Sequence, residues 1–153
     1  SDLLRTISAS SPTLSPMTSL LMSLGEKEHF ARMRRYWQVG TTEETPARWR
    51  QLSAFYNIAR LRIPALMQMS EQEYRYSLDY VIPLIRAHRA DLYVFPNEPH
   101  QKFQPRHKLA VYQRNLDWFR FWLLGEEDPS LEKKEQYIVW RKMRQSLPAE
   151  QPR

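Results

Sequence analysis

The residues best suited to chemistry are a histidine and an acid that each follow a short apolar run. His100 lies in a proline-bracketed turn after the β-prone run 92–95, and Glu71 comes just after the run 65–69. Loops carried on rigid elements often hold catalytic side chains, and histidine titrates near neutral pH without a perturbing environment. Considered alone, however, His100 is more simply a solvent-facing loop residue, and Glu71 an acid at a helix N-terminus.

The segments around these two residues have the pattern of a parallel α/β fold. Three short strands alternate with helices, and the apolar run in the second strand favours burial on both faces. We expect strands over residues 4–11, 65–69 and 92–95, and helices over 72–88, from Pro105 to Gly125, and after residue 130. The carboxyl ends of parallel strands meet at one edge of a sheet, so Glu71 and His100 should lie close together.

A long helical excursion separates the first two expected strands. It should contain two helical pieces between residues 17 and 37 and a short helix that begins at Pro46. Its aromatic residues Tyr36, Trp37 and Trp49 are candidates for a substrate pocket, although simple packing of the excursion is the somewhat stronger interpretation.

Aromatic and aliphatic spacing also predicts which side of the later helices packs on the sheet. In the helix from Pro105 the apolar residues recur at intervals of three and four, which is typical of one buried face. They are Leu109, Tyr112, Leu116, Phe119 and Leu123. The aromatic residues of this segment, Trp118, Phe119, Phe121 and Trp122, are likewise more consistent with core packing than with a recognition platform.

Composition excludes several classes of protein. The 153 residues are 42% hydrophobic and 26% charged, which is ordinary for one globular domain and wrong for a disordered chain. No apolar run approaches the roughly 20 residues that a membrane-spanning helix needs. The absence of cysteine excludes disulfides and cysteine-ligated zinc.

The net charge of +6 raises the question of nucleic-acid binding. The arginines are interleaved with tryptophan and tyrosine at helical spacing, which indicates solvated rims of packed helices and disfavours a nucleic-acid interface. His107 is seven residues from His100 but has no matched set of further metal ligands. His29 and His88 are expected on helix surfaces.

Three stretches of the sequence carry a resemblance to a known family. They are YVFPNEPH at residues 93–100, NLDWFRFWL at 115–123 and GEEDP at 125–129. With the preceding strand and acid, they resemble the C-terminal catalytic region of prolyl-oligopeptidase-family serine peptidases, which have the α/β-hydrolase fold. The resemblance extends over nearly the whole chain and is strongest to the branch that includes the lasso-peptide isopeptidases.

The resemblance implies a Ser–acid–His triad that hydrolyses a peptide or isopeptide bond without a cofactor or a metal. His100 matches the catalytic histidine of the family. The position of the acid falls on Glu71, where most relatives have aspartate, and Glu73 is a close competitor.

The nucleophile of such a triad is missing from the sequence. Its three glycines, Gly25, Gly40 and Gly125, belong to no Gly-x-Ser-x-Gly elbow, which in the family would precede residue 1. Residues 1–147 are therefore expected to be the C-terminal portion of a catalytic domain, inactive alone, and residues 148–153 a frayed tail. The implied partners are a peptide substrate, such as a lasso peptide, and the missing N-terminal part of the same enzyme.

Two alternatives remain at this point. The chain could be a non-catalytic binding or regulatory remnant of an α/β-hydrolase, or, with less support, a basic nucleic-acid-binding module.

Overall fold

A three-stranded parallel sheet forms the centre of the molecule. In the computed structural model, which describes residues 4–147, the strands are β1 (Ile7–Ala9), β2 (Ala65–Ser70) and β3 (Ala90–Phe95), in the order β1-β2-β3. Ala65 of β2 is in register with Ile7 of β1 and with Ala90 of β3. The predicted α/β class is confirmed.

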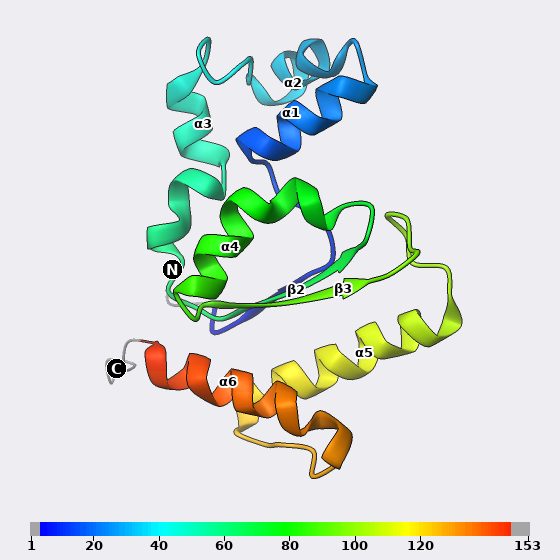
Figure 1. Ribbon diagram of the computed structural model, residues 1–153. Helices are drawn as coiled ribbons and strands as arrows, with labels where there is room; N and C mark the ends of the chain where they lie inside the picture. Colours follow the sequence, from blue (N-terminus) through cyan, green and yellow to red (C-terminus); the bar gives the residue numbers. More distant parts are fainter. Residues whose placement is uncertain (1–3, 148–153) are drawn as a thin grey trace.

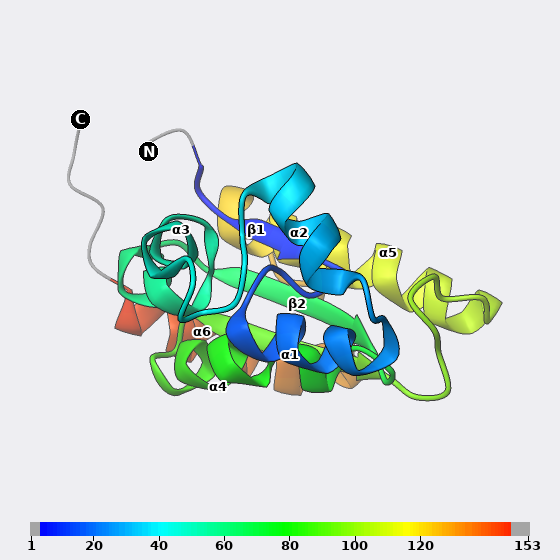
Figure 2. The ribbon, with the colours of Figure 1, turned by 90° about the horizontal axis from the view of Figure 1, so that it is seen from above.

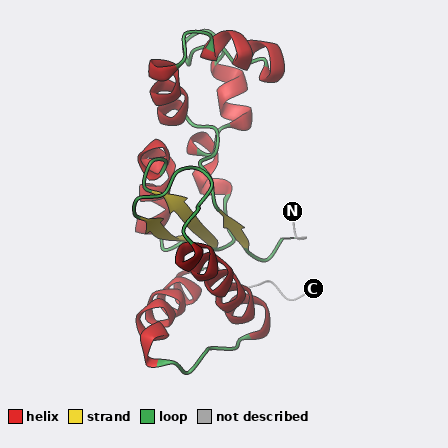
Figure 3. Cartoon of the chain, turned by 90° about the vertical axis from the view of Figure 1, so that its right-hand side faces the viewer, coloured by secondary structure: helices red, strands yellow, loops and turns green. Residues whose placement is uncertain are grey.

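Helices cover both faces of this sheet (Figure 1). On one face lies α4, with α1, α2 and α3 beyond it, and on the other face lie α5 and α6, so that a side view shows the sheet between two helical layers (Figure 3). The α-helices are α1 (Pro16–Gly25), α2 (His29–Trp37), α3 (Pro46–Leu52), α4 (Leu78–Arg86), α5 (Pro105–Phe119) and α6 (Lys134–Ser146). Shorter helical turns are η1 (Phe55–Arg60), η2 (Tyr74–Ser77), η3 (Arg120–Leu124) and η4 (Leu131–Lys133).

The middle strand β2 is buried along its whole length. Its side chains alternate between the two faces, as the strand period requires. Met67 and Met69 pack with Tyr80 on the α4 side, and Leu66 packs with the aromatic residues of α5 and α6. Gln68 is buried too, and its Nε2 donates to Asn115 Oδ1 at 2.8 Å, so this amide nitrogen is paired despite its burial.

An aromatic cluster joins α5 and α6 beneath the sheet. Trp118 and Trp140 meet edge to face at 5.0 Å between ring centroids, and Phe121 packs against both Trp140 and Tyr137. Trp118 Nε1 also donates to Thr6 Oγ1 at 2.7 Å, which ties α5 to the start of β1. The expectation that Trp118 and Phe121 belong to the core is confirmed.

The prediction of which face of α5 packs against the sheet is wrong. The five residues with helical spacing are all exposed, Tyr112 to 70%. The face that is buried lies beside them and includes Trp118 and even the carboxylate of Asp117, which pairs with Lys133. Apolar spacing identifies a stripe on a helix, but the neighbouring elements decide whether that stripe is covered. The exposed residues, called the α5 stripe below, are Leu109, Tyr112, Leu116, Phe119 and Leu123.

The segment before α4 also differs from the expectation. Instead of one helix from residue 72, a turn and the short helix η2 precede α4, which begins at Leu78. The buried side of α4 is formed by Tyr80, Val81 and Leu84. The turn is closed by Glu73 N, which donates to Ser70 O at 3.0 Å, and it changes the direction of the chain directly after β2.

Two other expectations concern histidines and the chain ends. His29 is buried at the start of α2, and His88 has a positive φ of 52° in the turn before β3, so neither lies on a helix surface as expected. The tail at 148–153, and the first three residues, lie outside the described residues. Among the helices that are described, none has the length and apolar character that crossing a membrane requires.

Candidate active site

The loops at the carboxyl ends of the three strands meet at one edge of the sheet. Ser11 and Pro12 follow β1, Glu71 and Glu73 follow β2, and His100 follows β3. Parallel pairing of β2 with β3 brings the last two loops together, since Ser70 is in register with Phe95. The parallel sheet therefore brings the loop that carries His100 and the loop that carries the two acids to the same edge.

The acid that contacts the histidine is Glu73. His100 Nδ1 lies 2.6 Å from Glu73 Oε1, and the other oxygen, Oε2, accepts a hydrogen bond of 3.0 Å from the hydroxyl of Ser70. Ser70 is fully buried, and the Glu73 side chain is only 13% exposed, whereas that of His100 is 65% exposed. The carboxylate is thus fixed in the protein and holds a ring that faces outward.

Glu71, to which the resemblance assigns the acid position, makes a different contact. Its Oε2 accepts a hydrogen bond of 2.6 Å from the backbone N–H of Asn97, at the start of the His100 loop. Asn97 has a positive φ of 54°, a left-handed conformation that asparagine tolerates better than most residues. The turn after β2 directs Glu73 to the His100 ring and leaves Glu71 beside Asn97.

A third carboxylate lies under the far end of the same loop. Glu98 is 1% exposed and accepts hydrogen bonds from Phe103 N, Gln104 N and His107 Nδ1. Burial raises the pKa of the Glu98 carboxyl, but these three donors outweigh burial and hold the pKa below its usual value. Glu98 was not predicted as a functional residue from the sequence, although Glu98 is two residues before His100 and His107 is seven residues after it.

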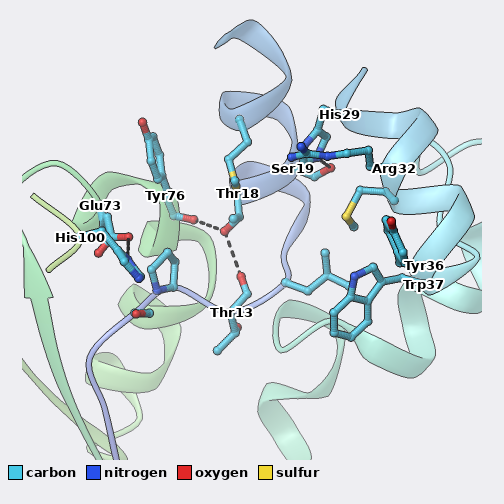
Figure 4. Close-up of a pocket in the computed structure, with 15 residues that line it drawn as sticks. Thr13, Thr18, Ser19, His29, Arg32, Tyr36, Trp37, Glu73, Tyr76 and His100 are labelled. Atoms are coloured by element: carbon cyan, nitrogen blue, oxygen red, sulfur yellow. Dashed lines mark hydrogen bonds and ion pairs between the residues drawn. The ribbon is translucent and has the colours of Figure 1, made fainter. Parts of the chain in front are cut away.

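A cavity of about 760 Å³ opens beside His100 (Figure 4). His100, Glu73 and Tyr76 lie on one side of it, and residues of α1 and α2 lie on the other. Ser11 and Pro12 from the end of β1 contribute to its wall. The helical excursion contributes apolar and aromatic lining residues, Leu14, Met22, Met33, Tyr36 and Trp37, together with polar ones, Thr13, Thr18, Ser19, His29 and Arg32.

The three aromatic pocket candidates separate in the structure. Tyr36 and Trp37, two of the candidates from the sequence, line the cavity, and Trp37 is 55% exposed. Trp49 is 1% exposed and outside the cavity lining, and its Nε1 donates to Gly40 O at 3.1 Å. Trp49 therefore packs the excursion, which was the other interpretation.

The far wall of the cavity contains a second histidine. His29 Nε2 lies 3.0 Å from the hydroxyl of Ser19, and both residues are buried. Burial lowers the pKa of His29, Glu26 partly opposes this shift, and Arg32 adds to it. His29 is therefore held in its neutral form more strongly than an exposed histidine. Within residues 4–147, no three His, Cys, Asp or Glu side chains are grouped to hold a metal ion.

The three parallel strands with helices on both faces place the chain in the α/β class. An α/β structure of this kind forms the C-terminal region of an isopeptidase whose structure is solved. That protein is the lasso peptide isopeptidase AtxE2 of Asticcacaulis excentricus, which is 43% identical to this chain over 97 residues. The aligned part is 63% of this chain and 14% of the relative. The chain is homologous to the C-terminal part of AtxE2.

Two solved structures of AtxE2 match the fold over 95% of the chain. The apo structure superposes with a TM-score of 0.81 and 32% identity. A serine-to-alanine variant with Astexin3-dC4 bound superposes with a TM-score of 0.79 and 33% identity. The chain spans 22% of the length of each. No protein-family model matches the chain.

Proposed function

We propose that this chain supplies the histidine and the orienting acid of an isopeptidase active site. His100 is the general base and then the general acid, and Glu73 holds its ring. The observation that carries this proposal is the 2.6 Å contact between His100 Nδ1 and Glu73 Oε1 at adjacent strand ends, in a chain homologous to part of an isopeptidase.

The geometry suits proton transfer at the other ring nitrogen. When Nδ1–H donates to Glu73, the lone pair is on Nε2, in a ring whose side chain is 65% exposed. Nε2 takes the proton of a serine hydroxyl as its oxygen attacks the amide carbonyl, and it returns the proton to the leaving amine. The fixed Glu73 carboxylate stabilises the imidazolium that forms between these steps.

The serine belongs to a part of the enzyme outside this sequence, which contains no Gly-x-Ser-x-Gly elbow. Two features support association with such a part. β1 is only half-buried and is a sheet edge among the described strands, and the α5 stripe is exposed. Parallel sheets are normally covered on both faces, and the unpaired backbone groups of an edge strand can pair with a further strand. This is also why we expect the chain alone to be inactive.

The substrate in this proposal is a peptide with an isopeptide bond, as in the lasso peptides processed by AtxE2. Its reacting carbonyl lies near His100, and the apolar wall with Tyr36 and Trp37 binds neighbouring side chains. In this arrangement Glu71 is a support for the loop through Asn97 N and has no part in the proton transfer.

A chimera tests the proposal. The C-terminal part of AtxE2 is replaced by this chain, and hydrolysis of Astexin3-dC4 by the purified chimera is followed by mass spectrometry. We expect hydrolysis, and we expect His100→Ala to lower kcat by about 10²–10⁴-fold or more. His88→Asn is the matched control, because His88 is an exposed histidine in a turn and asparagine tolerates its positive φ. A chimera in which His100→Ala retains full activity would refute the role of His100.

A further inference from the structure

We infer that Glu98 and His107 form a buried clamp that positions His100 against Glu73. The catalytic part of this inference rests on the function proposed above, but the positioning itself does not. Glu98 and His107 are positioning residues and do not contact the reacting atoms.

The clamp joins both ends of the loop that carries His100. Glu98 Oε2 accepts the N–H of Phe103 at 2.8 Å, and Oε1 accepts Gln104 N at 3.1 Å and His107 Nδ1 at 2.7 Å. One side chain at position 98 therefore fixes the backbone five and six residues later. His100 lies inside the closed segment.

His107 connects this segment to the rigid elements on either side. It lies in the first turn of α5, where its N–H donates to Gln104 O at 3.0 Å. Its ring packs against Phe95, the last residue of β3, with 5.3 Å between ring centroids. The Glu98–His107 contact thus joins the loop to the end of β3 and to the start of α5.

The His100 ring depends on such support because most of it faces solvent. Neighbouring side chains do not enclose the ring, so the position of its backbone decides whether Nδ1 reaches Glu73. Glu71 fixes the loop at Asn97 N, before His100, and the clamp fixes it after His100. A buried carboxylate that is fully hydrogen-bonded is costly to separate from its partners, which makes the second anchor rigid.

Two variants of His107 test the clamp in this chain. His107→Ala removes the donor to Glu98, and His107→Asn keeps a side-chain nitrogen close to the position of Nδ1. We expect His107→Ala to speed hydrogen exchange at Phe103 N and Gln104 N by about tenfold or more. We also expect loss of the His100 Nδ1–H signal in ¹H–¹⁵N spectra. In His107→Asn, exchange at the two amides should be slow again and the His100 Nδ1–H signal should be present.

The readout at His100 separates positioning from general stabilisation. If His107→Ala accelerates exchange in the loop but leaves the His100 Nδ1–H signal intact, the clamp is only structural and the inference is wrong. Global unfolding of His107→Ala would leave the decision to His107→Asn and to Glu98→Gln. In Glu98→Gln, one oxygen still accepts a backbone N–H, but an NH₂ group replaces the other acceptor, so the His100 signal should be lost in a folded protein.

The same variants in the AtxE2 chimera test the catalytic consequence. His107→Ala should lower kcat by about tenfold or more with little change in KM, because substrate contacts remain while His100 is misplaced. A chimera without activity, combined with the expected NMR result, would refute the proposed function and leave the clamp in place. Full activity and an unchanged His100 signal in His107→Ala would refute the clamp and leave the proposed function.

Discussion

His100 Nδ1 lies 2.6 Å from Glu73 Oε1, and not against the acid that directly follows β2. The reason is the turn that Glu73 N and Ser70 O close after the strand, which directs the side chain at position 73 to the neighbouring strand end. The hydroxyl of Ser70 then fixes the second oxygen of Glu73. The two acids thus have separate positions on the loop: one contacts the ring, and the other contacts the backbone.

Glutamine substitutions at the two acids should have unequal effects. Glu73→Gln replaces the charge that orients His100 and stabilises its protonated form, so the chimera should lose about 10²–10⁴-fold in kcat. Glu71→Gln retains an oxygen that can accept Asn97 N–H, so kcat should fall by less than about tenfold. Steady-state kinetics of both variants make the comparison. A larger loss for Glu71→Gln would assign the acid to Glu71 and contradict the role proposed for Glu73.

The sequence was sufficient to predict that the histidine and the acids lie at one edge of the sheet. That inference needs only the order of strands and helices and the rule for parallel strands. It was not sufficient to choose between Glu71 and Glu73, which are separated by one residue. The choice depends on the path of a three-residue turn, and neither propensity nor spacing determines that path. The contacts of Glu98 depend in the same way on the loop's fold.

Alanine substitutions of two tryptophans in the excursion test which of them packs the core and which lines the pocket. Trp49→Ala should destabilise the chain by about 3–5 kcal/mol, because Trp49 is fully buried and large aromatic truncations leave cavities. Trp37→Ala should change the free energy of unfolding by less than about 0.5 kcal/mol, since Trp37 is half exposed. Urea unfolding followed by circular dichroism measures both.

In the chimera, Trp37→Ala should instead raise KM for the peptide. A tenfold increase corresponds to about 1.4 kcal/mol of lost contact. An unchanged KM would mean that the cavity wall formed by α2 does not contact the substrate, and the pocket assignment of Trp37 would be withdrawn.

The buried His29 should make the stability of the chain depend on pH near neutrality. Its native pKa is lowered from 6.5 by burial, so the unfolded chain binds more protons than the native protein just below that pH. The free energy of unfolding is therefore highest above pH 6.5 and decreases as the pH falls towards the native pKa. His29→Gln, which keeps a side-chain amide near Ser19 but does not titrate, should flatten the profile between about pH 7.5 and 5.5.

Urea unfolding at several pH values, for the parent and for His29→Gln, provides this comparison. Carboxylates such as Glu98 contribute at lower pH, because their stabilisation is lost only below their ordinary pKa range. If the two profiles of stability against pH have the same slope between about pH 7.5 and 5.5, His29 does not cause the pH dependence.

The fold was predictable where local sequence and burial agree. The apolar composition of β2 alone predicted a buried strand. The structure agrees with this prediction because other elements flank β2 on both faces. Gly125, with a φ of 76°, ends the helical segment after α5 as its position suggested. The prediction that the α5 stripe is buried was wrong because no element among residues 4–147 covers this apolar surface. Hydrophobic periodicity predicts that a surface will be covered and not what covers it.

The α5 stripe should therefore be important for association and neutral for the stability of the isolated chain. Leu109→Lys with Leu116→Lys should change the free energy of unfolding by less than about 0.5 kcal/mol per site, because both side chains are more than half exposed. The same pair should reduce the yield of folded, active chimera, because the proposed function places the stripe against the remainder of the enzyme. The control is Leu131→Lys, which is 86% exposed and lies on η4, outside the stripe.

Size-exclusion chromatography should also show less self-association of the double variant than of the parent or the control, since exposed apolar patches promote self-association. An active, well-folded double-variant chimera would contradict the assignment of the stripe as an interface within the enzyme.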